Sequence, residues 1–367
     1  MRFDRRLFLH FDWTLLILVC LILAIGLVNL YSAGYNSNWE TSLCFRQARW
    51  ILIGLACMIA AFNIDYRFII RHAYTIYSMV AFLLLAIHFY GYATHGSQRW
   101  INVFGFSFQP SELMKLVIVL TLAKYFDDHK MNRSLLLREL LIPFSLVLLP
   151  FVLVFRQPDL GTALMLFIIF VSITLFVGIN WKSIGIAVAS GLVSVPVAWF
   201  FLKNYQKERI LAFLSPERDP LGSGYHIIQS MIAIGSGGFF GKGFLQGTQT
   251  QLNFLPEQQT DFVFSVYAEE WGFFGAVVLM ILFSLLVLWS LKIALHSRDY
   301  LGTLVAFGIS MLIFWGVLIN IGMVLGIFPV VGIPLPFMSY GGSAVVVLLT
   351  AVGLLLNISV RRYILHP

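Results

Sequence analysis

The sequence predicts an all-α integral membrane protein, one domain over residues 1–367, that crosses the bilayer ten times with both termini in the cytoplasm. Three observations support this prediction: the composition, the length of the apolar runs and the positions of the basic residues. Of 367 residues, 59% are hydrophobic and 11% are charged, and the mean hydropathy is +0.88. Soluble domains carry about 25% charged residues, so we expect lipid to be the solvent of this chain.

Apolar runs of membrane-spanning length recur along the chain. A spanning helix needs about 20 mostly apolar residues, and ten segments approach or exceed that length. The first run follows a basic N-terminus and is longer than the apolar region of about 7–15 residues in a cleavable signal, so we expect it to be retained. The predicted spans are 13–33, 49–63, 72–92, 111–126, 139–155, 160–179, 183–202, 262–292, 302–326 and 341–360.

The distribution of Lys and Arg predicts the orientation. With the N-terminus inside, the inner segments hold 14 of these residues and the short outer loops hold 4. Cytoplasmic loops carry such an excess, so both termini are expected inside, in agreement with an even number of spans. The net charge of +7 does not indicate nucleic-acid binding, because the basic residues form short clusters between apolar runs and no single basic face.

One predicted outer loop, residues 203–261 between the seventh and eighth spans, is far longer than the others. Loops above about 15 residues are usually functional or disordered. Residues 225–234 have the apolar spacing of a short amphipathic helix, so we expect this loop to be partly ordered. Residues 235–243 resemble a phosphate-binding loop but depart from that motif at Ser236 and Gly243. A flexible turn is the favoured interpretation, and a backbone nest for a pyrophosphate is the alternative.

Charged residues within or beside the spans are candidate functional residues, because they are costly at membrane depth. Glu112 and Lys115 share one helix face and can pair. They either line a polar cavity or form a neutral pair that packs helices. Arg156 and Asp159 lie in the turn between the short fifth span and the sixth. This turn either lies below the membrane surface beside a cavity or is an ordinary surface turn.

Acidic residues gather at the start of the eighth span. If the helix begins by Pro256, Glu257 and Asp261 share a face at i, i+4 spacing. Two carboxylates there could bind a divalent cation, or one could act as a general base. The alternative is a favourable interaction of each acid with the helix N-terminus. Glu269 and Glu270 follow within the same span, and the sequence assigns them no separate roles.

Eight segments, in order along nearly the whole chain, resemble the SEDS family, the shape, elongation, division and sporulation proteins. One such segment alone would be weak, whereas eight in sequence are specific. Within the family, the short termini and residues 247–251 resemble the elongation branch more than the division branch. The segments are residues 96–100, 108–115, 157–162, 219–230, 235–243, 254–262, 320–323 and 329–343.

The resemblance implies a peptidoglycan glycosyltransferase of the bacterial cytoplasmic (inner) membrane that polymerises lipid II at the outer face. Asp261 matches the essential aspartate of the family, for which the implied role is the general base that activates the GlcNAc 4-hydroxyl. Gln259 departs from the family, many members of which carry His there. The implied partners are a class B penicillin-binding protein, which supplies transpeptidation, and other membrane proteins of the elongation complex.

The pyrophosphate leaving group of this reaction needs cationic stabilisation. A divalent cation, Mg²⁺ or Mn²⁺, is expected, with Glu257 and Asp261 as its candidate ligands. Gln229 and Ser339, in two of the matched segments, are further candidates for the substrate cavity. The candidate cationic side chains on the outer side are Lys115, Arg156, Arg209, Arg218 and Lys242.

A lipid II flippase or other transporter is the main alternative. Charges within the spans and a hairpin broken by Pro329, Pro334 and Pro336 suit a transporter equally well. The division role within the same family and a scaffold for cell-wall enzymes are further alternatives. A long ordered outer loop that ends at an acidic residue favours the polymerase, which needs access from one face only.

Overall fold

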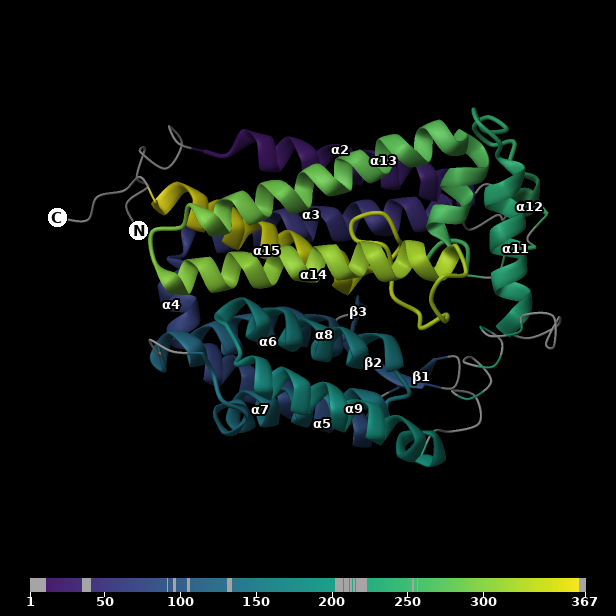
Figure 1. Cartoon of the computed structure of the whole chain (residues 1–367). Helices are drawn as coiled ribbons and strands as arrows, with labels where there is room; N and C mark the ends of the chain where they lie inside the picture. The colour runs from purple at the N-terminus through teal and green to yellow at the C-terminus, as the bar shows by residue number, and fades with distance from the viewer. Residues whose placement is uncertain are drawn as a thin grey trace.

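The computed structural model is a bundle of long helices that lie roughly side by side (Figure 1). The first described helix begins, and the last one ends, at the same end of this bundle (Figure 1). The structure describes residues 11–34, 41–90, 92–94, 97–103, 106–130, 134–201, 207, 211, 213, 215, 223–252, 254–255 and 257–362.

Every predicted span coincides with a helix. A 3-10 turn, Leu137–Leu140, precedes α7. The helices are α2 Trp13–Ala33, α3 Thr41–Asn63, α4 Tyr66–Arg71, α5 Ala73–Tyr90, α6 Pro110–Asp128, α7 Leu141–Arg156, α8 Leu160–Val177, α9 Trp181–Phe201, α11 Ser223–Ser236, α12 Thr248–Gln251, α13 Val263–Leu295, α14 Tyr300–Val324 and α15 Gly342–Arg361.

Seven segments within the described residues are long and apolar enough to cross a membrane, and they lie on α2, α3, α7, α8, α13, α14 and α15. The α5 and α9 helices contribute shorter apolar stretches. The α6 helix is not in this class because Glu112, Lys115, Lys124, Asp127 and Asp128 lower its hydropathy. The prediction of a multi-pass membrane protein is therefore confirmed, whereas the count of ten crossings remains a prediction.

The all-α prediction is wrong for the connection between α5 and α6. There the chain forms a small antiparallel sheet with the order β1-β2-β3, in which β2 pairs with both neighbours. Residues 97–103 were expected to form loop, yet they form the middle strand, because each flanking strand supplies backbone hydrogen-bond partners that a loop would lack. The strands are β1 Tyr92–Thr94, β2 Ser97–Val103 and β3 Phe106–Phe108.

The centre of the bundle is formed by α6, α14 and α15. Of the most apolar stretch of each helix, 72% of residues are buried in α14 and 83% in α15, against 17% in α3. The exposed remainder of α3 faces the surroundings of the bundle, where its apolar side chains suit lipid. At Gly353 of α15 an added Cβ would collide with the backbone of Met58 on α3. A small residue therefore lets these two helices approach closely, as membrane helices commonly do.

The α13 helix is broken at Gly272, so the predicted span 262–292 is wrong as one continuous helix. Gly272 has φ 65° and ψ −164°, a conformation that an L-residue rarely adopts. The break leaves a half-helix of residues 263–271 and a long helix of residues 273–295. Figure 1 shows the bend beside α11 and α12.

The glycine-rich loop 235–243 contains the predicted turn, and hydrogen bonds fasten this turn into the break. The backbone amides of Lys242 and Gly243 donate to the carbonyls of Glu269 and Glu270, each at 3.0 Å. On the other side of the break, the amide of Phe273 donates to the Gly238 carbonyl at 2.9 Å. The loop thus supplies backbone hydrogen bonds that the broken helix cannot make internally.

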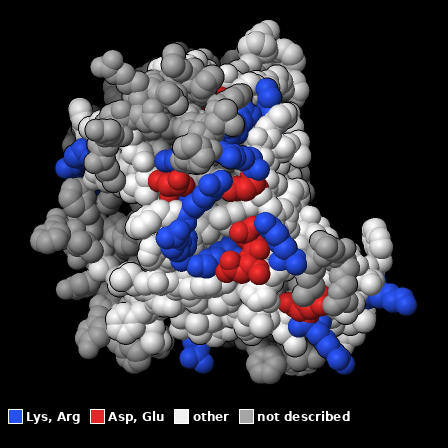
Figure 2. Space-filling model, turned by 90° about the vertical axis from the view of Figure 1, so that its left-hand side faces the viewer, with Lys and Arg blue, Asp and Glu red and all other residues white. Residues whose placement is uncertain are grey.

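Charged side chains gather at the end of the bundle where the described chain begins and ends (Figure 2). Arg67 pairs with Asp299 at 2.8 Å, and Lys130 pairs with Asp127 at 2.7 Å. Asp299 also caps α14 by accepting a hydrogen bond from the amide of Gly302 at 2.8 Å. This end therefore combines basic residues with acidic partners at the termini of helices.

Candidate functional site

Asp261 lies in an irregular turn, residues 257–262, directly before the half-helix of α13. The expectation of a helix beginning by Pro256 is wrong, because the helix begins at Val263, and Pro256 itself lies outside the described residues. Glu257 has a φ of 50°, and its carbonyl accepts from the amides of Thr260 and Phe262 at 3.1 and 3.3 Å. The i, i+4 argument for one shared helix face therefore does not apply.

Hydrogen bonds to backbone atoms hold this turn against distant parts of the chain. The Asn320 side chain on α14 donates to the Asp261 carbonyl at 2.9 Å and to the Ile333 carbonyl at 2.7 Å. The Ser339 hydroxyl donates to the Thr260 carbonyl at 2.5 Å. The turn is therefore fastened to α14 and to the loop that connects α14 with α15.

Helix α2 supports the same turn from another side. Gln258 donates from Nε2 to the carbonyl of Ala33 at 2.9 Å, and Asn29 donates from Nδ2 to the carbonyl of Val263 at 2.8 Å. Both amide side chains are buried. Buried hydrogen bonds of this kind are expensive to lose because the remaining partner stays desolvated. The backbone around Asp261 is therefore held from three directions.

The Asp261 carboxylate lies against the backbone of the α14–α15 loop. A Cβ added at Gly332 would lie 3.3 Å from Oδ2 of Asp261, and Gly332 has a φ of 73°. The same stretch of loop packs on the start of α8, where a Cβ added at Gly161 would lie 2.5 Å from the carbonyl oxygen of Val331. Asp261 is half-buried, so part of the residue is exposed while its backbone is fixed.

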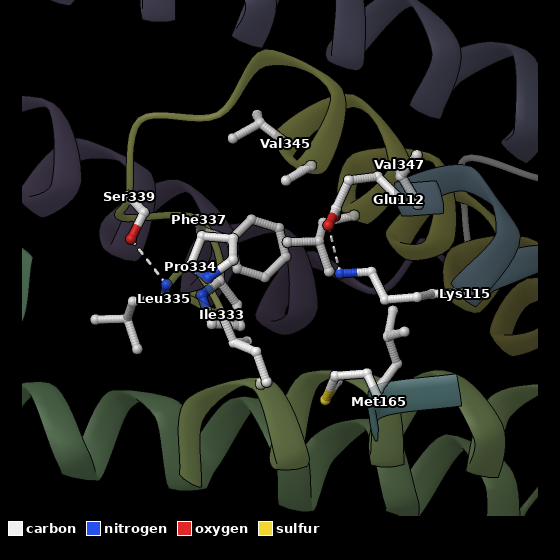
Figure 3. Close-up of a pocket in the computed structure, with 15 residues that line it drawn as sticks. Glu112, Lys115, Met165, Ile333, Pro334, Leu335, Phe337, Ser339, Val345 and Val347 are labelled. Carbon is white, nitrogen blue, oxygen red and sulfur yellow. Dashed lines mark hydrogen bonds and ion pairs between the residues drawn. The ribbon is translucent and has the colours of Figure 1, made fainter. Parts of the chain in front are cut away.

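Glu112 and Lys115 form a buried ion pair on α6, with 2.8 Å between Nζ and Oε1. The pair lies at a cavity of about 30 Å³ whose opposite wall is the α14–α15 loop (Figure 3). Ser339 and Leu335, which are hydrogen-bonded to each other at 2.7 Å, lie on that wall. The volume is about that of one water molecule in the liquid. The loop that contacts Asp261 is thus also the loop that covers this charged pair.

Asp159 caps the start of α8. Its carboxylate accepts from the amide and the hydroxyl of Thr162 at 3.1 and 2.9 Å, and from Nε2 of Gln109 at 3.1 Å. Arg156 is exposed at the end of α7. Arg99 of β2 donates to the carbonyl of Gln157 at 2.9 Å and also to that of Pro158. Asp159 therefore acts as a helix cap, whereas the Arg156 guanidinium remains accessible.

The other predicted cations differ in how the structure places them. Lys242 pairs with the buried carboxylate of Glu269 at 2.6 Å. The Lys242 ammonium is therefore neutralised by Glu269 and is less available to a phosphate ligand. Gln229 lies half-buried on α11, and Ser339 is buried in the loop described above. Arg209 and Arg218 lie outside the described residues.

The expected metal ligands do not form a protein cage. Glu257 is exposed, and its Oε2 accepts from the Thr260 hydroxyl at 3.2 Å. Within the described part of the chain, no group of three or more His, Cys, Asp or Glu side chains is placed to bind a metal ion. Magnesium is commonly held by one or two carboxylates and takes its remaining ligands from substrate phosphates and water, so a cation held by these two acids stays a prediction.

Asn320 and Arg99 are two of the residues that sequence reasoning missed, beside Asn29 and Gln258. The first two lie in matched segments, and neither was assigned a role. A buried amide within the apolar run of α14 was the available signal for Asn320, since such a group needs a partner. Nothing in the composition near Arg99 indicates that it contacts the α7–α8 turn.

Comparisons with known proteins give a consistent family. The family model described as cell cycle protein, which covers FtsW, RodA and SpoVE, matches residues 12–364. The chain is 40% identical to the peptidoglycan glycosyltransferase MrdB of Escherichia coli over 362 residues, which cover 97% of this chain and 95% of MrdB.

Two solved structures are similar over almost the whole chain. One is a chain from a study of how a peptidoglycan synthase complex coordinates polymerization and crosslinking. It has a TM-score of 0.83 and 35% identity and covers 96% of this chain and 98% of its own length. The other is the rod shape determining protein RodA of Thermus thermophilus, with a TM-score of 0.72, 30% identity and the same two coverages.

Proposed function

Because this chain belongs to the FtsW, RodA and SpoVE family, the SEDS proteins, we propose that it polymerises lipid II into glycan strands during cell elongation. It is an enzyme of the peptidoglycan glycosyltransferase class. The observation that carries the proposal is the half-buried carboxylate of Asp261, whose backbone is fixed by Asn320 and whose neighbour Thr260 is fixed by Ser339. A general base needs this combination of accessibility and fixed position.

In the proposed reaction, the Asp261 carboxylate takes the proton from the 4-hydroxyl of the GlcNAc unit of one lipid II molecule. The oxygen attacks the anomeric carbon of the MurNAc unit at the end of the growing strand. The bond from that carbon to the pyrophosphate breaks, and undecaprenyl pyrophosphate leaves with inversion at the anomeric carbon. A second acid is not required, because pyrophosphate is already a good leaving group.

The leaving group still needs positive charge nearby. A bound Mg²⁺ or Mn²⁺ would neutralise part of the pyrophosphate charge, and Asp261 and Glu257 are the acids proposed to hold it together with the substrate. Among the described cations, Arg156 is exposed, whereas Lys115 and Lys242 are paired with glutamates. Of these three candidates, Arg156 is therefore the one best able to contact a phosphate, and Arg46 and Arg49 of α3 are exposed as well.

The proposed topology has ten spans and both termini in the cytoplasm of a bacterial inner membrane, with residues 203–261 outside. The basic residues of the end shown in Figure 2 support this orientation, since cytoplasmic segments carry such an excess. The predicted amphipathic helix of the outer loop corresponds to α11, Ser223–Ser236, which lies at the opposite end of the bundle (Figure 1).

The proposed partners are a class B penicillin-binding protein and the membrane proteins of the elongation complex. The similarity to a chain from a peptidoglycan synthase complex supports a partner that crosslinks the new strands. Elongation is favoured over division because the identity is 40% to MrdB and 37% to the probable peptidoglycan glycosyltransferase FtsW of Trichlorobacter lovleyi. Restoration of rod shape in a cell that lacks its own elongation polymerase tests this choice, and restoration of division instead would overturn it.

The central test is polymerisation of purified lipid II by the protein in liposomes. Asp261→Asn removes the base and keeps the size, so we expect polymer to fall at least about 100-fold while expression is retained. Asp128→Asn, at an exposed residue at the end of α6, is the matched control and should keep full yield. Full polymer yield from Asp261→Asn would refute the assignment.

Removal of divalent cations by a chelator tests the metal proposal separately. Polymerisation should stop and should return when Mg²⁺ or Mn²⁺ is added back. Unchanged polymerisation in the chelator would exclude the cation and leave the Asp261 assignment standing.

The structure adds one observation in favour of the transporter alternative. Broken membrane helices often form transporter sites, and α13 is broken at Gly272. Movement of lipid II across the liposome membrane by the wild-type protein, without any polymer, would favour the transporter.

A further inference from the structure

The half-helix 263–271 is a short buried element, separated from the rest of α13 by the break, with Asp261 just before its first turn. Its nine residues span about 14 Å at 1.5 Å per residue. The first end is fixed through Asn29 at Val263. The other end stops at the break at Gly272, so the continuous α13 backbone does not set its direction. Other contacts at that end must therefore decide how the half-helix, and Asp261 with it, is oriented.

The backbone amides of Lys242 and Gly243 hold that end through the carbonyls of Glu269 and Glu270, and the Glu269 side chain adds the largest set of side-chain contacts there. It is fully buried, with an exposed fraction of 0%. Its carboxylate receives five donors, all from the segment 242–250. At Oε1 these are Lys242 Nζ at 2.6 Å, Thr248 Oγ1 at 3.2 Å and the Gln249 amide at 3.0 Å, and at Oε2 they are the Thr250 amide at 3.4 Å and Thr250 Oγ1 at 3.2 Å.

The neighbouring Glu270 offers a natural contrast. It is equally buried, with an exposed fraction of 1%. Its Oε1 accepts from the Leu245 amide at 3.2 Å and from the Ser32 hydroxyl. Its Oε2 has no hydrogen-bond partner among the described residues. An amide nitrogen can therefore replace one oxygen of Glu270 without facing a donor, whereas at Glu269 it would face a donor in either orientation.

We propose that Glu269 is a positioning residue for the glycosyl transfer. Its carboxylate ties the half-helix to the outer segment 242–250 and thereby sets the position of Asp261 relative to the substrate. The inference rests on the proposed role of Asp261 as base. Glu269 does not touch the reacting atoms. Because misplacement of a catalytic group by about 1 Å can cost about 100-fold in rate, loss of this contact should reach the chemistry.

The first experiment compares Glu269→Gln with Glu270→Gln in lipid II polymerisation. Enzyme is counted by lipid II binding, so that kcat refers to folded protein. We expect Glu269→Gln to lower kcat at least about 10-fold with KM changed less than about 3-fold, since the interaction acts on the transition state. Glu270→Gln should stay within about 3-fold of wild type in both constants. Equal kcat values for the two variants would overturn the proposal.

A second pair of variants reaches the same carboxylate without changing any charge. At Gly247, which has an ordinary φ of −67°, an added Cβ would lie 2.8 Å from Glu269 Oε2. Gly247→Ala should therefore displace the carboxylate and lower kcat. Gly185→Ala on α9 adds a Cβ that meets nothing within 4 Å and should leave kcat unchanged. Wild-type kcat for Gly247→Ala would count against the proposal.

The double variant Lys242→Met, Glu269→Gln excludes a simpler cause. Glu269→Gln leaves the Lys242 ammonium without its carboxylate, and the double variant removes that ammonium. If the hydrogen bonds of the Glu269 carboxylate to the segment 242–250 position Asp261, kcat stays low in the double variant. A return to wild-type kcat would overturn the proposal.

Asp261→Asn separates this inference from the proposed function. An inactive Asp261→Asn protein together with a fully active Glu269→Gln protein would refute the positioning role alone. An active Asp261→Asn protein would refute the base that the inference depends on.

Discussion

The two ends of the helical bundle carry their charges in opposite ways. At the end that contains the described chain ends, the ion pair Arg67–Asp299 has side-chain exposed fractions of 42% and 28%. On the side of Asp261, the pair Lys242–Glu269 has exposed fractions of 24% and 0%, and the pair Lys115–Glu112 has 10% and 7%. Of these three ion pairs, the one at the first end is therefore exposed to water, whereas the two on the side of Asp261 are largely enclosed by protein.

This difference indicates in which part of the protein single side chains determine stability and activity. Exposed ion pairs contribute about 0–1 kcal/mol because water and salt screen them. A buried pair contributes little net stability when it forms, but loss of one partner leaves an uncompensated charge. The side with enclosed charges is also the side that fixes Asp261. We therefore expect substitutions there to affect both stability and activity.

The largest effect is expected for the ion pair on α6. Lys115→Met leaves the buried Glu112 carboxylate without its partner, at a cost of about 3–5 kcal/mol. A fall of several degrees in the unfolding midpoint in detergent would confirm this. Replacing both residues, Glu112→Leu with Lys115→Met, should recover most of the stability, and failure of the double variant to do so would contradict the explanation.

The next effect concerns an uncharged residue. Gly332→Ala places a side chain at a φ of 73° and a Cβ at 3.3 Å from Asp261 Oδ2. The backbone strain should cost about 1–2 kcal/mol, and displacement of the carboxylate should lower kcat about 10-fold or more. Gly185→Ala on α9, where an added Cβ meets nothing within 4 Å, is the control. Unaltered polymerisation by Gly332→Ala would show that this contact does not position Asp261.

At the opposite end of the bundle, loss of the Asp299 carboxylate should lower stability only slightly and should leave kcat unchanged. Asp299→Ala removes the cap of α14 and the contacts to Tyr66 and Arg67. Loss of a helix cap costs about 1 kcal/mol, so the unfolding midpoint should fall slightly. The kcat per folded enzyme should equal that of wild type. A kcat reduced 10-fold would contradict the proposal that substitutions at this end leave activity unchanged.

An exposed pair should matter least. Lys130→Met breaks the contact with Asp127, whose side-chain exposed fraction is 26% against 55% for Lys130. We expect a change below about 0.5 kcal/mol, and a smaller one in high salt. A loss of 2 kcal/mol in a urea titration would show that this end is more tightly coupled than its exposure indicates.

Tyr66 makes the free energy of unfolding depend on pH, but only in alkaline solution. Burial, followed by the nearby charge of Asp299, raises the pKa of Tyr66 above its ordinary value of 10. The folded state therefore binds the phenol proton more tightly than the unfolded state does. Its stabilising contribution is complete below pH 10 and is lost as the pH rises above that value. Tyr66→Phe should flatten the stability curve there, and an identical slope in both proteins would contradict the assignment.

The helices could be predicted because the hydropathy of consecutive residues identifies the segments that lie in lipid. Each predicted span coincides with a helix, since about 20 apolar residues in lipid must satisfy their backbone groups internally. The break at Gly272 could not be read in this way, because it lies inside an apolar run and depends on a backbone conformation. The strands of residues 92–108 were missed because their pairing depends on their neighbours.

Some residues of the candidate site could likewise be predicted from the sequence, and others could not. Asp261 could be identified from its segment, and Glu112 with Lys115 from their depth and spacing. Asn320, which fixes Asp261 from 59 residues away, and Ser339, which fixes Thr260 from 79 residues away, could be named only as members of matched segments. Lys242 was expected to be available for a phosphate, but Glu269 occupies it.

The sequence by itself thus determined that the chain lives in a membrane, which segments are helical and which carboxylate is the candidate base. The first two properties follow from composition and spacing, which are local and add up along the chain, whereas the resemblance to the SEDS family is what distinguishes Asp261 from Glu257. Only the tertiary structure decided how α13 is broken, what fills the break and which side chains hold the turn of Asp261. Those outcomes depend on hydrogen bonds between backbone atoms and distant side chains, and such bonds exist only once the segments have met.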